Sequence, residues 1–419
     1  MASPDRLLGL LPEGQVLTGE RAAAWTGGAP ARAVVFPASV EETQAVVCVA
    51  NETGTRLLPA GRASWLGAGG WAAALEAVVV STERMDEVRH YEPADLTLSA
   101  GAGLGWTGLS RVVRPNGQWL AVDAPGMGLG TVGGVVACGV SGPLRGRYGA
   151  ARDNVLGLEV VTGGGRILRI GGRVVKNVAG YDLVRLFTGS RGSLGIITNV
   201  SVRLFPRGES DVTLRFGGGA AEVVEMARAA CTSVLPVAAV EVETGGAGAE
   251  PMTLIVRLLG GPDEVDEVCS RLAEYVGAEP DAVLRDGVSE AFHDDRTGWE
   301  ADATVVARLT ALPDRLGRVL ERARAIAAVM GGEVSADALH GVVRVKGSPA
   351  PDRVDVLTEA MSGTRAAMEE AGGTLTLSDA PRQVAARVGW SGGVGEDGGL
   401  GARLKALFDP NSILSPRCP

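Results

Sequence analysis

The chain has 419 residues, a formal net charge of −9 and a pI near 5.1. This length allows two or three domains with a substantial core. The acidic balance argues against nucleic acid as a partner, because phosphate backbones attract basic surfaces. The basic residues are nearly all arginine, and the only lysines are Lys176, Lys346 and Lys405.

The cysteines are scattered, without a C-x-x-C pair, at Cys48, Cys138, Cys231, Cys269 and Cys418. This spacing excludes a self-contained cysteine-ligated iron–sulfur cluster and indicates buried thiols in a reducing compartment. Residues 1–11 lack the pattern of a signal peptide, and no apolar run approaches the length that spans a bilayer. We therefore expect a cytoplasmic protein with at most peripheral membrane association and no bound metal.

The first elements form a β-α-β unit. Residues 33–36 are typical of a buried strand. Ser39, followed by Glu42, is a capping-box pattern that predicts a helix ending near Gly54. Residues 55–58 then predict the second strand.

A loop of small residues, Pro59 to Trp65, follows that strand directly. A loop at this place in a β-α-β unit is a natural phosphate site, because its backbone amides can converge on an anion. An ordinary β-turn explains the same residues equally well. Both interpretations stay open from this loop alone.

Short apolar segments and turn residues alternate through the next 140 positions or so. We expect strands at residues 78–82, 96–100, 118–122, 158–162, 166–170 and 195–204, and helices at 105–113 and 182–187. The strands on either side of Gly163-Gly164-Gly165 predict a hairpin.

Glycines are dense between Asp123 and Val200, above all in residues 125–134 and 192–198. Amides in such segments approach a ligand without a Cβ in the way, which predicts a nucleotide-type cofactor site. Two matches to G-x-G-x-x-G, at 103–108 and 128–133, are not NAD signatures. Neither lies in the first β-α-β unit with an acidic residue ending the next strand.

Beyond Pro206-Arg207-Gly208, strands alternate with amphipathic helices. We expect strands at 212–216, 238–242, 253–259, 304–309, 341–346 and 374–377, and helices at 220–231, 262–276, 313–330, 352–371 and 400–408. The order β-α-β-β-α-β, with a second partial copy, predicts an antiparallel sheet covered on one face.

Several motifs together carry a family resemblance. They are residues 37–42, 59–65, 131–134, 141–145, 149–157, 171–182 and 408–410. In this order they resemble the FAD domain of the vanillyl-alcohol-oxidase and p-cresol-methylhydroxylase family, and within it the FAD-binding subunits of bacterial glycolate oxidases. The resemblance covers about residues 30–206 and the C-terminus.

The resemblance implies an α+β fold: a two-subdomain FAD-binding domain and an α/β cap domain with an antiparallel, ferredoxin-like sheet. The corresponding division is a lead-in at 1–29, the FAD-binding domain at 30–207, the cap for substrate or partner at 208–399, and a C-terminal segment at 400–419 that returns to the FAD domain.

The resemblance also implies which residues hold non-covalent FAD. The first loop would wrap the pyrophosphate, a second group would flank pyrophosphate and flavin, and the segment from Arg191 would run along the cofactor. The implied residues are Pro59, Ala60, Gly61, Arg62, Ala63, Ser64 and Trp65; Pro125, Thr131, Val132, Gly133, Gly134, Val135, Val140, Ser141, Gly142 and Pro143; and Gly195, Ile196 and Ile197.

The chain departs from the family pattern at two of these places. Arg62 and Ala63 interrupt a loop that is usually rich in glycine, so its conformation or phosphate contacts are expected to differ. Arg191 stands where relatives commonly have Glu.

The chain has three histidines, His90, His293 and His340. None lies in the predicted cofactor loops, so the histidyl flavin link of some relatives is not expected. The histidine-rich metal motif of the catalytic glycolate oxidase subunit is absent from the sequence. His293 beside Asp294 and Asp295 could act as a base or metal ligand, but we favour a satisfied surface histidine, and His340 is interpreted in the same way. No catalytic residue can be named.

The resemblance implies an FAD-binding oxidoreductase subunit that oxidises glycolate, or a similar 2-hydroxy acid such as D-lactate, beside a catalytic flavoprotein and an iron–sulfur subunit. Two alternatives stay open: a stand-alone FAD-dependent oxidase or dehydrogenase of another alcohol or 2-hydroxy acid, and an FAD-binding scaffold without turnover.

Overall fold

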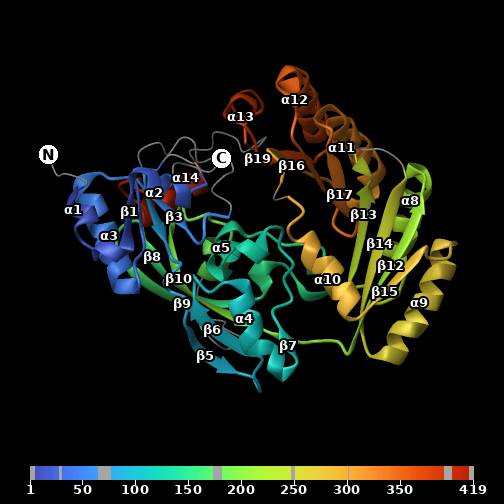
Figure 1. Cartoon of the computed structure of the whole chain (residues 1–419), viewed down its shortest axis with the longest axis horizontal. Coiled ribbons are helices and arrows are strands. Elements are labelled where there is room, and N and C mark those ends of the chain that lie inside the picture. Colours follow the sequence, from blue (N-terminus) through green and yellow to red (C-terminus); the bar gives the residue numbers. More distant parts are fainter. Residues whose placement is uncertain are drawn as a thin grey trace. The chain divides into compact units, whose positions relative to one another are not determined.

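A computed structural model divides the chain into two compact units (Figure 1). It describes residues 5–27, 31–64, 77–172, 182–246, 251–300, 302–390 and 399–414. The first unit comprises Met1–Ser141, Gly149–Pro206 and Gly395–Pro419, and the second comprises Gly142–Tyr148 and Arg207–Val394.

Two main sheets build the first unit. One has the strand order β1-β2-β4-β3, with β4 parallel to both neighbours, and the other is antiparallel in the order β5-β6-β10-β8-β9. The strands are β1 (Val16–Thr18), β2 (Ala33–Val35), β3 (Leu57–Ala60), β4 (Val78–Ser81), β5 (Val88–Glu92), β6 (Thr97–Gly101), β8 (Val155–Thr162), β9 (Ile167–Gly171) and β10 (Gly195–Arg203). A short ribbon pairs β7 (Gln118–Trp119) with β11 (Phe205–Pro206).

Helix α3 (Val40–Thr53) lies between β2 and β3 along the chain. The Ser39 hydroxyl accepts a hydrogen bond from the Glu42 amide at 3.1 Å, and Gly54 ends the helix with φ of 66°. The helix start and end predicted from the capping pattern are therefore confirmed. Its buried face shares one apolar cluster with residues of both sheets, so the helix is packed between them.

The remaining helices of the first unit are short. They are α1 (Asp5–Leu8), α2 (Gly19–Trp25), α4 (Trp106–Val113), α5 (Val132–Cys138), α7 (Leu183–Phe187) and α14 (Leu400–Phe408). Helices predicted at 105–113, 182–187 and 400–408 are confirmed, as is the β8–β9 hairpin. The strands β1 and β5 and the helix α5 were not predicted from the sequence. Of the strand predicted at 118–122, only the two residues of β7 are in a strand.

The second unit is built on one eight-stranded antiparallel sheet, in the order β15-β12-β14-β13-β17-β18-β16-β19. Its strands are β12 (Ser210–Gly218), β13 (Ala239–Thr244), β14 (Met252–Gly260), β15 (Ala282–Arg285), β16 (Val305–Thr310), β17 (Glu333–Asp337), β18 (Val342–Gly347) and β19 (Thr374–Asp379). The antiparallel sheet predicted from the element order is confirmed.

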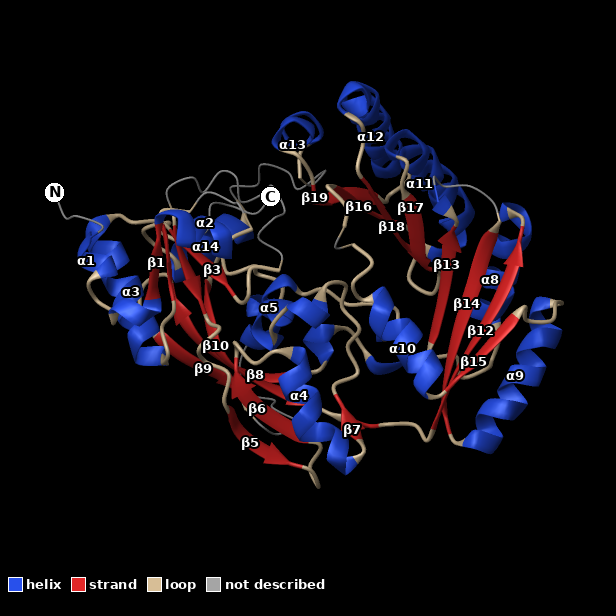
Figure 2. Cartoon of the chain, viewed as in Figure 1, coloured by secondary structure: helices blue, strands red, loops and turns tan. Residues whose placement is uncertain are grey.

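The two faces of this sheet differ in chemistry. Along β12, Val212 and Leu214 belong to the apolar core, whereas Asp211 and Thr213 lie on the opposite face because side chains alternate along a strand. Helices cover the apolar face, and α10 lies on the other (Figure 2). The helices are α6 (Arg145–Tyr148), α8 (Ala220–Thr232), α9 (Pro262–Val276), α10 (Gly287–Arg296), α11 (Leu316–Met330), α12 (Val354–Glu370) and α13 (Arg382–Val388).

Within the part of the chain that the structure describes, no helix is both long and apolar enough to cross a lipid bilayer.

Candidate functional site

An open cavity lies in the first unit, beside the ends of β3 and β4. The two strands are parallel neighbours, so the residues that follow them emerge at the same edge of the sheet. The cavity is lined by Pro59, Ala60, Gly61, Arg62, Ala63, Ser64, Thr82, Thr131, Gly133, Gly134, Ala137, Cys138, Arg191, Gly192, Gly195, Ile196 and Ile197. Three segments far apart in the sequence therefore meet here.

Glycines make this convergence possible. A Cβ added to Gly61 would lie 2.4 Å from the Thr131 hydroxyl oxygen, and one added to Gly192 would lie 2.8 Å from a Pro59 ring carbon. Both distances are shorter than van der Waals contact, so a larger residue would push the segments apart. Gly61, Gly133 and Ile197, one from each predicted segment, line the same cavity.

The backbone amides of the loop at residues 61–64 are candidate hydrogen-bond donors for a ligand. None of these four amides donates to another residue within the described ranges. Ala63 has φ of 61°, a left-handed conformation that costs a residue with a Cβ energy and that recurs at ligand-binding loops. Successive unpaired amides beside a cavity form an anion site, which fits the diphosphate of a dinucleotide cofactor.

Helix α5 provides a wall of the cavity rather than donors. The Val132 and Gly133 amides each donate at 2.9 Å, to the carbonyls of Leu104 and Ala102. The Gly134 amide donates to the Thr131 hydroxyl at 3.1 Å, which caps the helix. This segment was expected to flank the pyrophosphate and flavin, but its first amides are already satisfied inside the protein.

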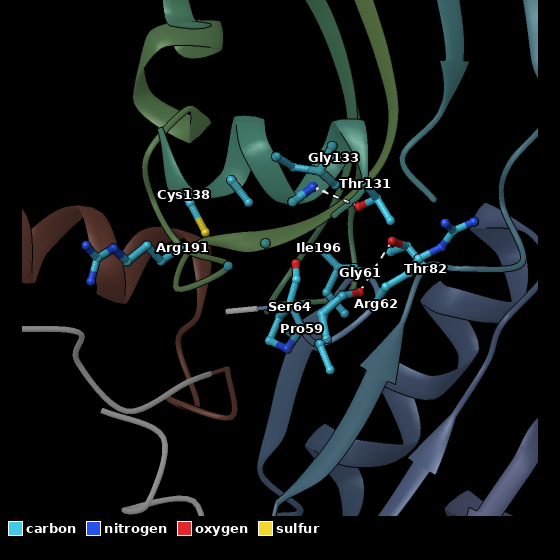
Figure 3. A pocket seen from close by; sticks show the side chains of 17 residues that line it. Pro59, Gly61, Arg62, Ser64, Thr82, Thr131, Gly133, Cys138, Arg191 and Ile196 are labelled. Carbon is cyan, nitrogen blue, oxygen red and sulfur yellow. Dashed lines mark hydrogen bonds between the residues drawn. The ribbon is translucent and has the colours of Figure 1, made fainter. Parts of the chain in front are cut away.

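The two arginines of the cavity lie on opposite sides of the view in Figure 3. The Arg62 guanidinium packs against Gly105, where an added Cβ would lie 2.7 Å from Nη1. Arg62 therefore contributes its backbone to the loop while its charge lies against a neighbouring turn. The Arg191 amide donates to the Ala137 carbonyl at 2.7 Å, which ties the segment at 191–195 to the end of α5.

The predicted residues divide into two groups. The cavity-lining ones are Pro59 to Ser64, Thr131, Gly133, Gly134, Gly195, Ile196 and Ile197, whereas Pro125, Val132, Val135, Val140, Ser141, Gly142 and Pro143 do not line it. Trp65 falls outside the described residues. The Val132 and Val135 side chains are buried in the core, and the Ser141 hydroxyl accepts from the Ala151 amide at 2.8 Å.

Five lining residues were absent from the set of named residues: Thr82, Ala137, Cys138, Arg191 and Gly192. The last two lie in the segment that was expected to run along the cofactor. Thr82 directly follows β4, and β4 is the parallel neighbour of β3, which leads into the predicted phosphate loop. The predicted strands could therefore have placed Thr82 beside that loop. Ala137 and Cys138 follow Gly134 at helical spacing, and they could be placed only by recognising α5 as a helix.

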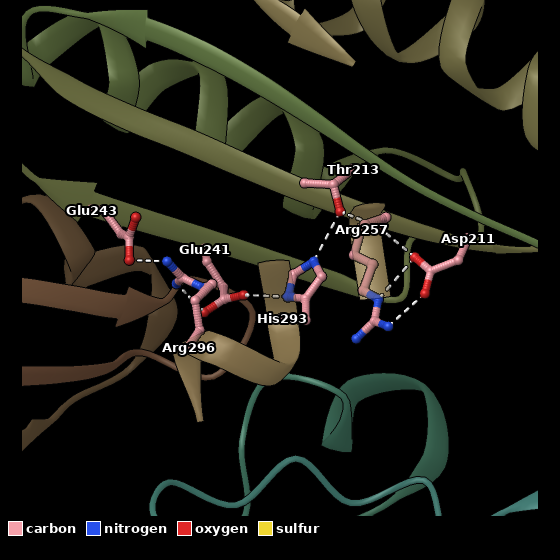
Figure 4. Close-up of polar contacts among 8 residues, drawn as sticks. Asp211, Thr213, Glu241, Glu243, Arg257, His293 and Arg296 are labelled. Atoms are coloured by element: carbon pink, nitrogen blue, oxygen red, sulfur yellow. Dashed lines mark hydrogen bonds and ion pairs between the residues drawn. The ribbon is translucent and has the colours of Figure 1, made fainter. Parts of the chain in front are cut away.

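A second polar arrangement lies in the second unit, on the sheet face that carries α10 (Figure 4). Arg257 donates two hydrogen bonds to the Asp211 carboxylate, at 3.1 and 2.6 Å, and both side chains are buried. The Ser289 hydroxyl donates to the same carboxylate at 2.7 Å. Arg296 pairs with Glu241 and Glu243. These side chains satisfy one another.

His293 belongs to this buried network, so its interpretation as a surface histidine is wrong; its side chain is only 10% exposed. Its Nε2 lies 2.9 Å from the Thr213 hydroxyl. Burial, reinforced by the Arg257 charge, lowers the pKa of His293 to about 4, although Glu241 acts in the opposite direction. His293 is therefore neutral at pH 7.

His340 is half-buried, and its Nδ1 lies 2.9 and 3.0 Å from the two Asp337 oxygens. Arg145 also contacts Asp337, at 3.3 Å. Across the described ranges, no group of three or more His, Cys, Asp or Glu side chains is arranged to hold a metal ion.

Comparison with known proteins identifies the segment that forms most of the cavity. Residues 31–171 match a family described as an FAD binding domain. The chain is 43% identical over 127 residues to the glycolate oxidase subunit GlcE of Escherichia coli (strain K12), covering 30% of this chain and 36% of the relative. It is 36% identical over 183 residues to the glycolate oxidase subunit GlcD of Bacillus subtilis (strain 168), covering 43% and 38%.

These alignments span less than half the length of the curated relatives. The likeness in fold extends further. The solved structure of p-cresol methylhydroxylase with substrate bound matches with a TM-score of 0.75, covering 98% of this chain and 95% of that chain at 16% identity. The α+β fold is therefore confirmed, and its first unit contains the segment that matches the FAD binding domain family.

Proposed function

Since residues 31–171 belong to the family of FAD binding domains, we propose that the protein is an FAD-binding oxidoreductase subunit that takes part in the oxidation of glycolate or a similar 2-hydroxy acid. The names of the relatives GlcE and GlcD support the substrate class and a multi-subunit assembly. In this proposal the electrons pass to a partner, with a catalytic flavoprotein and an iron–sulfur subunit as companions.

The observation that carries the proposal is the loop at residues 61–64, whose amides donate to no other described residue and which lies within the segment that matches the FAD family. These amides would hold the diphosphate, and Thr82 and Ile196 would form walls beside it. When bound, FAD supplies the two-electron oxidation of a CH–OH carbon. The acidic chain needs no cationic side chain for this contact, because backbone donors act on a polyanion without one.

The visible spectrum of the purified full-length chain tests cofactor binding. We expect a flavin spectrum, with the flavin released on acid denaturation because no covalent link is expected. A chain that remains free of flavin after incubation with excess FAD would contradict the proposal and favour a scaffold without cofactor.

Anaerobic addition of glycolate or D-lactate then separates the functional alternatives. The subunit hypothesis predicts flavin bleaching only when cysteine-rich companion subunits are co-expressed. Bleaching of the isolated chain would instead identify a stand-alone dehydrogenase. Bound flavin that no 2-hydroxy acid bleaches, with or without companions, would contradict a role in 2-hydroxy acid oxidation.

A further inference from the structure

Lys405, on helix α14, is the only lysine among the described residues of the first unit. Its side chain is only 18% exposed. A lysine is unexpected in a chain whose basic residues are nearly all arginine. The surroundings of its ammonium group explain why lysine stands at this position.

The Lys405 ammonium donates to three oxygens of the C-terminal segment and a cavity loop. They are the Ser193 carbonyl at 2.7 Å, the Leu414 carbonyl at 3.1 Å and the Asp409 carboxylate. An ammonium has three N–H donors around one nitrogen, so each donor has an acceptor. The donors of an arginine side chain lie in one plane on separate nitrogens, so arginine cannot reproduce this arrangement around a single nitrogen.

Asp409 organises the turn that follows α14. It is fully buried, and its carboxylate accepts hydrogen bonds from the Ile413 amide at 3.1 Å and the Leu414 amide at 3.0 Å. The Lys405 charge compensates this buried carboxylate. The pair therefore fixes the path of residues 409–414.

This turn is attached to both sides of the cofactor cavity. Leu414 pairs in parallel with Leu57, whose amide donates to the Ile413 carbonyl at 2.7 Å, and Leu57 lies two residues before the start of the cavity-lining loop. Ser193 follows Arg191 and Gly192, which line the cavity from the segment at 191–195. One ammonium group thus holds both segments through the C-terminal turn.

We propose that Lys405 is a positioning residue for the cofactor, which sets the separation between the loop at 59–64 and the segment at 191–195. Cofactor affinity then depends on docking of the C-terminal segment. The inference rests on the proposed function insofar as this cavity binds FAD. It adds a determinant that does not line the cavity and lies far along the chain from the family's matched segment.

The first test measures FAD affinity of the FAD-free full-length chain by fluorescence quenching. Lys405→Met removes all three donors, and we expect FAD binding to weaken at least about 10-fold. Lys405→Arg keeps the charge but not the arrangement of the three hydrogen bonds, so this variant should also bind FAD more weakly than the wild type. If Lys405→Met does not fold, Lys405→Arg alone provides the test. Wild-type affinity in the soluble variants would overturn the proposal.

A matched control separates positioning from loss of stability. Val113→Ala shortens a fully buried side chain on α4, which does not line the cavity. With thermal stability lowered to a similar extent, Val113→Ala should keep the wild-type FAD affinity within about 2-fold. Equal weakening by both variants would show that Lys405 is only structural, and would overturn the proposal.

Hydrogen exchange in the FAD-free protein provides a readout that does not require binding. Lys405→Met should speed exchange of the hydrogen-bonded amides of Leu57, Arg191 and Ser193, whereas Val113→Ala should not. Unchanged exchange in Lys405→Met would overturn the inference. If the wild type binds no FAD, the proposed function fails, and this measurement still decides whether Lys405 holds the two loops.

Discussion

Two regions, one in each unit, differ in how their polar groups are paired. In the first unit, four consecutive backbone amides at residues 61–64 donate to no described residue and lie beside a cavity. In the second, the charged side chains around Asp211 and Arg257 are buried but closed on one another. Unpaired donors beside a cavity call for a ligand, whereas a satisfied network does not.

The same contrast recurs between two glycine-rich segments of the first unit. The loop at 61–64 leaves its amides available, but the start of α5 uses its amides on Ala102, Leu104 and Thr131. Glycine density alone therefore does not identify an anion site. What decides is where each backbone donor is directed.

The largest effect should come from opening the closed network. Asp211→Ala leaves the buried Arg257 guanidinium without its partner, and we expect a loss of about 3–5 kcal/mol in the stability of the second unit. Urea-dependent hydrogen exchange of β12 and β14 measures it. The control is Asp266→Ala, which removes the exposed Arg285 pair and should cost under about 1 kcal/mol. Equal losses would refute the contrast between a buried network and a surface pair.

Acidification should open the same network through His293. Because its folded pKa of about 4 is below the unfolded value, the unfolded chain binds more protons below pH 6.5. Stability is then lost as the pH falls from about 6.5 towards 4, by on the order of 3 kcal/mol.

The groups facing His293 are Arg257, Glu241 and Asp211. Although burial raises the pKa of Glu241, its ion pairs lower it below the ordinary value, so the stability from Glu241 is lost at lower pH than that from His293. His293→Gln should flatten the decline in the urea midpoint between pH 7 and pH 5. An unchanged pH profile in that variant would assign the acid sensitivity to other groups.

Crowding the loop at 61–64 should weaken cofactor binding. In Gly61→Ala the new Cβ meets the Thr131 hydroxyl at 2.4 Å, so the loop must move. Overpacking of this kind costs about 1–3 kcal/mol, which corresponds to roughly 5- to 150-fold weaker FAD binding. Titration of the FAD-free protein measures the change. The control Gly14→Ala has no atom within 4 Å of the new Cβ and should bind FAD normally.

Much of this arrangement could be predicted from local sequence signals. Features that depend on nearby residues were predicted correctly. They are the cap at Ser39, the β8–β9 hairpin and the strand β12. The cavity loop at 59–64 followed from its place after a strand.

The features that were missed depend on tertiary contacts. Helix α5 is rich in glycine and valine, which have low helix propensity, so packing and the Thr131 cap rather than propensity stabilise it. His293 looked like a surface residue beside two acids, and only the unpredicted helix α10 buries it. The role of Lys405 depends on residues more than 200 positions away in sequence.

The smallest effect should come from the residue that most resembles a phosphate ligand. Arg62 follows Gly61 in the loop, but its guanidinium packs against Gly105. Arg62→Gln keeps the backbone donor and removes only the charge, so FAD affinity should change by no more than about 2-fold. The dependence of FAD affinity on salt should also be unchanged, because salt screens charges and the proposed contact is made by neutral backbone amides. A loss of 10-fold or more, reduced at high salt, would show that the loop depends on a cationic side chain and would break the contrast drawn between backbone donors and charged side chains.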